Sequence, residues 1–157
     1  MQIKKDVCPR MVTFRPPRIA ISLLLFAAAA QFVAPADWVD LGSLPAAAAV
    51  IGLTGFLLMI SAWWLFKIRD NAICPTADTA TLITDDVYRL THNPMYLGIV
   101  MMLVSVGLFA ASIFYFLAAA IFFLIINHSF CPYEEHKLRL IFGEHFTSYA
   151  KTVRRWL

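Results

Sequence analysis

The sequence predicts an all-α membrane protein with four transmembrane helices and a cytoplasmic, amphipathic helical segment at its C-terminus. Of its 157 residues, 61% are hydrophobic and only 15% are charged, whereas a soluble domain carries about a quarter charged residues. No Asp, Glu, Lys or Arg occurs between Asp40 and Lys67, or between Arg89 and Glu134. A bilayer core needs about 20 helical residues, so the first tract accommodates one span and the second accommodates two.

The four expected spans belong to a single domain, residues 1–157, and cover about residues 18–35, 43–66, 94–111 and 113–130. The first span follows a basic N-terminal arm and ends at Pro35. A secretory signal peptide is the alternative for this stretch, because the residues around Pro35 resemble a cleavage site. We expect a retained span.

The basic residues predict the orientation of the chain. All thirteen Lys and Arg residues lie within residues 1–18, 67–89 and 134–157. Because cytoplasmic loops carry an excess of Lys and Arg, we expect a multi-pass protein of the bacterial inner membrane with both termini in the cytoplasm. The net charge of +3 suits contact with anionic headgroups of the lipid bilayer and predicts no nucleic acid partner.

The C-terminal stretch predicts two short helices outside the membrane. Residues 132–142 form the first, which begins at Pro132 and stops at Gly143. The second carries Phe146, Tyr149 and Val153 on one face and charged residues on the other. These helices could anchor the chain at the membrane surface, which composition favours, or they could form a lid over a site at the ends of the spans.

Asn93 and Pro94 predict the start of the third span, with the Asn side chain capping free backbone N–H groups and Pro in the first turn. The positive end of this helix would lie at the cytoplasmic interface, where it can bind an anionic group. The alternative is an ordinary capped span with Tyr96 as an interfacial aromatic residue.

Two adjacent carboxylates, Glu134 and Glu135, follow the fourth span and suit the start of a helix. Because the third and fourth spans form a hairpin, these carboxylates should lie beside Asn93 at the mouth of an apolar bundle, where polar groups form a candidate ligand site. No pair of histidines has the spacing of a zinc helix. We therefore expect no metal.

These segments belong to a longer set of short motifs. The set comprises Thr81-Leu82-Ile83-Thr84, Tyr88, Asn93-Pro94-Met95-Tyr96-Leu97-Gly98, Glu134-Glu135, Leu138, Phe142-Gly143, Phe146, Tyr149 and Arg154-Arg155-Trp156. It covers about residues 80–156, and its order, with a hydrophobic hairpin in the middle, resembles the signature of the isoprenylcysteine carboxyl methyltransferase and phospholipid methyltransferase family. These are integral-membrane enzymes that use S-adenosylmethionine.

The resemblance implies methyl transfer from S-adenosylmethionine to a hydrophobic or lipid-like acceptor at the cytoplasmic face. It assigns cofactor binding to Thr81, Leu82, Ile83, Tyr88, Asn93, Pro94, Met95, Tyr96 and Glu134. The start of the third span would hold the cofactor carboxylate, Glu134 its ammonium or hydroxyl groups, and Tyr88 or Tyr96 its sulfonium by a cation–π contact. Tyr96 and Glu135 are the candidate catalytic residues, with Glu135 as the base for an amine acceptor.

Three positions depart from the family pattern. His92 stands where the family usually has Arg, and Asp86 stands where it usually has Gly. Phe130 stands where the prenylcysteine enzymes have an Arg that looks as though it holds the substrate carboxylate. This last departure disfavours a prenylcysteine carboxylate as the substrate.

Two other functions compete with this interpretation. A non-catalytic four-span protein for transport or interaction would leave the segments at Asn93 and Glu134 without a joint purpose. A lipid reductase that uses NADPH, similar to the steroid reductases, would be expected to have more spans. The sequence leaves the methyl acceptor open among a lipid carboxylate, a phospholipid amine, an isoprenoid thiol and a quinone-like hydroxyl.

Overall fold

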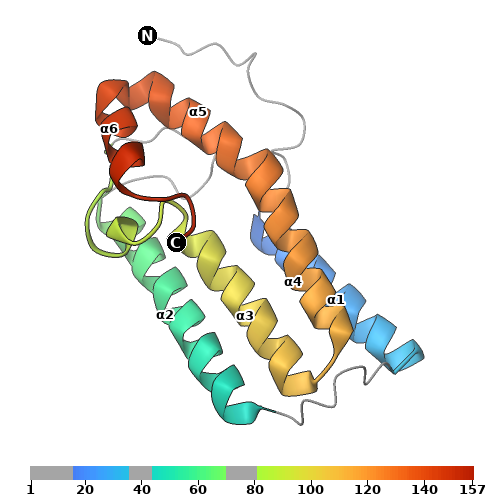
Figure 1. Cartoon of the computed structure of the whole chain (residues 1–157). Helices are drawn as coiled ribbons and strands as arrows, with labels where there is room; N and C mark the ends of the chain where they lie inside the picture. The colour runs from blue at the N-terminus through green and yellow to red at the C-terminus, as the bar shows by residue number, and fades with distance from the viewer. Residues whose placement is uncertain (1–15, 36–43, 70–80) are drawn as a thin grey trace.

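The computed structural model describes residues 16–35, 44–69 and 81–157, and these residues form helices joined by turns (Figure 1). The helices are α1 (Pro16–Val33), α2 (Pro45–Ile68), α3 (Pro94–Ala110), α4 (Ile113–Ile125), α5 (Cys131–Phe142) and α6 (Glu144–Thr152), with a 3₁₀ turn η3 (Asp86–Arg89) and a π turn η4 (Ile126–Phe130). The prediction of an all-helical chain is confirmed for these residues. The predicted basic arm lies, up to residue 15, outside the described ranges.

Three helices are long and apolar enough to cross a membrane, which indicates an integral, multi-pass membrane protein. They are α1, α2 and the helix that runs from Ile113 to Phe142. A shorter apolar helix, α3, has 17 residues. It packs against α2 on one side and α4 on the other, and α1 contacts α4 and α3. Figure 1 shows α2, α3 and α4 side by side.

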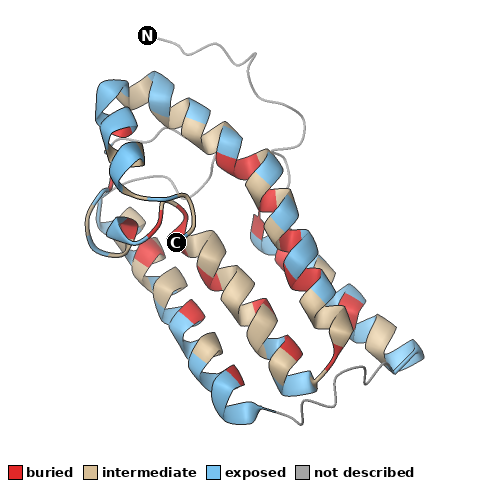
Figure 2. Ribbon diagram, in the orientation of Figure 1, coloured by how far each residue is buried: buried red, intermediate tan, exposed pale blue. Residues whose placement is uncertain are grey.

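Many buried positions are small residues, while many large apolar side chains are exposed. Figure 2 shows the buried positions of α2 on the side that faces α3 and exposed positions along its outer side. Phe26 of α1 and Phe109 of α3 are 74% and 68% exposed, as expected for side chains that face lipid. The buried positions of α2 are Ala48, Gly55 and Ala62. Because lipid chains are as apolar as Leu, membrane helices associate through close packing of such small residues.

The backbones of α2 and α3 touch at Gly55 and Gly98. A Cβ added to Gly98 would lie 2.5 Å from the carbonyl oxygen of Gly55, and one added to Gly55 would lie 2.8 Å from that of Gly98. Farther along the same contact, the Ser105 hydroxyl donates a hydrogen bond of 2.7 Å to the Ala48 carbonyl. The glycine that ends the Asn93–Gly98 motif therefore permits the close approach of α2 to α3.

The turn between α3 and α4 consists of residues 111–112, where the third and fourth predicted spans meet. Ala111 takes a left-handed conformation there, with φ of 48°. The next residue, Ser112, is fully buried, and its hydroxyl donates a 2.6 Å hydrogen bond to the side-chain oxygen of Gln31. This bond joins the far end of α1 to the α3–α4 hairpin.

The predicted break between a span ending at residue 130 and a separate helix starting at Pro132 is wrong. Residues Ile113–Phe142 form one helix of 30 residues. Proline removes a backbone donor and clashes with the carbonyl four residues earlier. Here the π turn widens the helix just before Pro132, with the Cys131 N–H bonded to the Ile126 carbonyl five residues back. The predicted stop at Gly143 is confirmed, with φ of 54°.

Candidate functional site

The segments that carry the predicted site residues meet at one end of the helix bundle. The end of α2, residues 81–93, the start of α3, α5, α6 and the C-terminal residues all gather there (Figure 1). One apolar cluster at this end contains Ala62, Ile83 and Tyr88, with Met95 and Tyr149 packed against it. Residues as far apart along the chain as Ala62 and Tyr149 are thereby joined in one place.

A carboxylate and a tyrosine meet between the first turn of α3 and the first turn of α5. The Tyr96 hydroxyl donates a hydrogen bond to Oε1 of Glu134. Tyr88, from η3, is buried, and burial together with the nearby Glu134 carboxylate raises the pKa of its hydroxyl above its ordinary value. The expectation that the start of the third apolar helix and Glu134 are neighbours is confirmed.

Asn93 begins α3 but does not cap it. The helix starts at Pro94, as predicted, and the Leu97 N–H bonds to the Asn93 carbonyl at 3.0 Å. The Asn93 side chain makes no cap hydrogen bond, so the predicted capping role is wrong. Instead, its Nδ2 donates to the carbonyl of Arg155 at 3.1 Å, and the Thr91 hydroxyl donates to the same oxygen at 2.8 Å. The Asn93 side chain therefore binds the C-terminal residues in place of the first turn of α3.

The C-terminal tail, residues 153–157, lies between the start of α3 and the helix α4–η4–α5. The Arg155 guanidinium forms a bidentate pair with Glu135, with Nε–Oε1 at 2.6 Å and Nη2–Oε2 at 2.9 Å. The Trp156 indole N–H donates to Oδ1 of Asn127 at 2.9 Å, and its ring packs 4.7 Å from that of Phe123. No local sequence pattern predicts these contacts. The one available signal is Asn127, a polar residue at the end of a long apolar run.

His92 is held between aromatic rings. Its ring centroid lies 4.8 Å from that of Tyr149 and 6.1 Å from that of Phe146. Both ring nitrogens are buried, and among the described residues neither makes a hydrogen bond of good geometry, although the Val153 backbone lies near enough to favour the charged ring. Burial lowers the pKa of His92, so a neutral ring occupies the position where the sequence pattern expects a cationic Arg.

The apolar face of α6 packs onto the chain itself. Phe146 is 1% exposed, and the Tyr149 hydroxyl donates a hydrogen bond to the Tyr88 carbonyl. This face therefore covers residues 88–92, which fits a lid better than an anchor that inserts its apolar face into the bilayer. Val153, expected on the same face, lies just beyond the end of α6.

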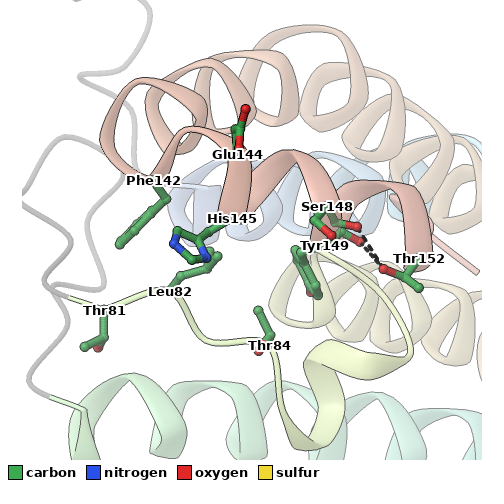
Figure 3. Close-up of a pocket in the computed structure, with 9 residues that line it drawn as sticks. All are labelled: Thr81, Leu82, Thr84, Phe142, Glu144, His145, Ser148, Tyr149 and Thr152. Atoms are coloured by element: carbon green, nitrogen blue, oxygen red, sulfur yellow. Dashed lines mark hydrogen bonds between the residues drawn. The ribbon is translucent and has the colours of Figure 1, made fainter.

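A pocket of about 810 Å³ opens between residues 81–84 and α6 (Figure 3). It is lined by Thr81, Leu82, Thr84, Phe142, Glu144, His145, Ser148, Tyr149 and Thr152. In Figure 3, residues 81–84 run along one side of the pocket and α6 along the other, and the Glu144 side chain points away from residues 81–84. The lining combines hydroxyl groups with aromatic rings and is more polar than most small-molecule sites.

The predicted site residues divide into three neighbouring groups. Thr81 and Leu82 line the pocket. Ile83, Tyr88 and Met95 pack in the apolar cluster beside it. The third group, at the α3–α5 contact and under the tail, consists of Asn93, Pro94, Tyr96, Glu134 and Glu135.

Two further positions complete the comparison with the sequence pattern. Phe130 is 4% exposed and belongs to the core cluster with Phe122 and Ile126, so this position offers no group to hold a substrate carboxylate. In the described part of the chain, no group of three or more His, Cys, Asp or Glu side chains is placed to hold a metal ion.

Asp86 explains why the sequence pattern favours glycine at this position. Its φ is 50°, in the left-handed region, which Gly adopts freely and which Asp tolerates better than most residues. The side chain of the preceding Asp85 pairs with Arg69, and its backbone carbonyl accepts a hydrogen bond from the Tyr88 N–H at 3.0 Å. These two contacts fix the turn.

We expect Asp86→Gly to raise the free energy of unfolding by about 0.5–1 kcal/mol, because it relieves the left-handed strain at some cost in chain entropy. Thermal unfolding in detergent measures this change. Asp86→Val, which is β-branched, should shift the midpoint the other way. A lower midpoint for Asp86→Gly would mean that the carboxylate contributes more than its conformation.

Comparison with known protein families gives a match. Residues 45–145, more than half of the chain, match the family described as phospholipid methyltransferase, PEMT. No curated protein and no solved structure matches the chain. The matched region runs from the start of α2 to the start of α6 and includes Tyr88, Tyr96 and Glu134. The chain therefore belongs to the phospholipid methyltransferase family and carries its methyltransferase domain.

Proposed function

We propose that this protein transfers a methyl group from S-adenosylmethionine to a hydrophobic or lipid-like acceptor at the cytoplasmic face of the membrane. The observation that carries the proposal is the hydrogen bond between Tyr96 and Glu134 at one end of an apolar helix bundle. The buried Tyr88 lies close enough for the Glu134 carboxylate to raise its pKa, and the pocket opens beside the Tyr88 cluster. Family membership supports methyl transfer, and the membrane helices support a lipid acceptor.

The residues at this end suit the cofactor chemically. The open pocket of about 810 Å³ has room for a small molecule. Glu134, Tyr88 and Tyr96 do not line it, but Tyr149 does, and Tyr149 packs against the cluster that contains Tyr88. We assign the cofactor to Thr81, Leu82 and their neighbours, with its ammonium or hydroxyl groups on Glu134. The rings of Tyr88 and Tyr96 can stabilise a sulfonium through cation–π contacts.

Positioning accounts for most of the catalysis that this site would supply. S-adenosylmethionine brings a methyl group that is already activated on a sulfonium. The protein then has to hold the acceptor within about 3–3.5 Å of that methyl group, which contributes several kcal/mol. Tyr96, between Glu134 and the apolar core, is our candidate for contacting the reacting groups. The base role predicted for Glu135 with an amine acceptor stays untested, and the Arg155 guanidinium that binds both of its oxygens argues against it.

We further propose four spans with both termini in the cytoplasm. With 17 residues, α3 lies at the short end of the range for spanning helices. The Lys and Arg residues of the described ranges lie in the first turn of α1, at the end of α2, in η3, or from α5 onward. These elements are at the same end as the candidate site. Because cytoplasmic segments carry an excess of Lys and Arg, we place this end in the cytoplasm. A bacterial inner membrane remains our prediction.

Calorimetry on the detergent-purified protein tests the proposed function. We expect micromolar binding of S-adenosylmethionine and none of NADPH. Binding of NADPH alone would favour the reductase alternative. If a folded, monodisperse protein bound neither cofactor, the proposal would be wrong and a non-catalytic role would take its place.

A further inference from the structure

We infer that the C-terminal tail, residues 153–157, is a positioning element of the proposed methyl-transfer site, and that Glu135 and Arg155 act in it as a pair. The inference rests on the proposed function for what is positioned. It gives Glu135 a different role from that of a base, because both of its oxygens are bound by one guanidinium.

Arg155 connects two elements of the site, one through its side chain and the other through its backbone carbonyl. Its guanidinium binds Glu135 on α5, and its carbonyl accepts hydrogen bonds from Thr91 and Asn93 just before α3. A parallel bond runs from the His92 N–H to the Arg154 carbonyl at 3.1 Å. The tail thereby sets where α3 begins relative to α5, and this is the contact at which Tyr96 meets Glu134.

The groups that face the tail have few alternatives to it. Thr91 is fully buried and Asn93 is 8% exposed, so loss of the Arg155 carbonyl would leave buried polar groups unpaired. The Glu135 side chain is 16% exposed. Bidentate Arg–carboxylate pairs fix geometry in addition to supplying energy. The tail therefore holds its neighbours in one arrangement.

Trp156 fastens the tail independently of the ion pair. Its indole N–H bonds to Asn127 in the π turn, and its ring packs on Phe123. The Arg155 Nη1 reaches the same Asn127 oxygen at 3.4 Å. The tail is thus fixed both to the π turn and to α5, on the side of the helix that carries Glu135.

A double-mutant cycle tests the inference through affinity for S-adenosylmethionine. We expect Glu135→Gln and Arg155→Gln each to raise the Kd about tenfold, the size of one lost charge-assisted interaction. The double variant should be no worse than either single variant, because both remove one shared interaction. A base would behave differently: Glu135→Gln would lower turnover and leave cofactor affinity unchanged.

Matched controls keep the outcomes distinct. Arg139→Gln removes an exposed guanidinium 3.9 Å from Glu135 and should leave the Kd unchanged. Trp156→Phe keeps a ring on Phe123 but loses the donor to Asn127, so we expect a smaller rise in Kd. This variant serves as the test if the charge variants do not fold.

Two results would overturn this inference alone: single variants with an unchanged Kd, or a double variant whose effect is the product of the effects of the single variants. Absence of binding by the wild type overturns the proposed function and this inference together.

Discussion

Gly98→Ala is expected to separate α2 from α3 and to lower the thermal stability of the detergent-solubilised protein. The added methyl group would meet the Gly55 carbonyl at 2.5 Å and the Met59 Cβ at 2.9 Å, and neither neighbour is the flexible end of a side chain. Overpacking of this kind costs about 1–3 kcal/mol. A gain in helix propensity of about 1 kcal/mol offsets part of that loss. Gly98→Leu should leave little folded protein.

Gly107→Ala is the matched control on the same helix. Its methyl group would lie 3.2 Å from ring atoms of Phe116, and a ring can shift by a few tenths of an ångström. Because both substitutions gain the same helix propensity, the difference between the two unfolding midpoints reports the α2–α3 contact. Equal midpoints would show that the two backbones do not approach as closely as described. We also expect Gly98→Ala to weaken cofactor binding, because a displaced α3 would move Tyr96, which lies two residues before Gly98.

Glu134→Ala is expected to raise the Kd for S-adenosylmethionine by roughly 10- to 100-fold, as for loss of a hydrogen bond to a charged group. The carboxylate is the acidic group closest to Tyr96 and would face the positive charges of the cofactor. Calorimetry on folded variants measures the change. His136→Ala, on the exposed side of the same helix, should bind like the wild type.

Two conservative variants separate the charge of Glu134 from its hydrogen bond. Burial raises the pKa of Glu134 to about 7, so its charge is fully present only above that pH. Glu134→Gln keeps an acceptor for the Tyr96 hydroxyl but loses this charge, so at pH 8 we expect it to bind nearly as poorly as Glu134→Ala. Tyr96→Phe keeps the charge and removes the donor, and should weaken binding less. Wild-type affinity in Glu134→Gln would mean that Glu134 serves only to hold Tyr96 in place.

Much of the fold could be predicted because its signals are local. The start of α3 at Pro94 and the stop at Gly143 are set by residues with special backbone properties. The apolar tracts place the other helices within two or three residues of their predicted starts. The continuity of α4 into α5 could not be predicted from Pro132, because a wider turn upstream accommodates the proline, and that turn has no sequence marker.

The candidate site could be predicted only in part. The motif order identified Tyr96 and Glu134, and the hairpin brought them together. The roles of Asn93 and Glu135 depended on Arg155, which reaches them from 62 and 20 positions along the chain. Local patterns do not encode such pairings, so the cap expected of Asn93 was wrong, and the tail's partner on α5 could not be identified.

The π turn also sets the angular position of everything beyond it. In an α-helix each residue advances the side chains by about 100° around the axis, so one residue accommodated in a wide turn changes the side of the bundle that α5 presents. Glu134 and Glu135 lie four and five residues past this turn and face different partners, Tyr96 and Arg155. The two carboxylates therefore depend on a rotational offset that is fixed at the end of the apolar segment, before the chain reaches either of them.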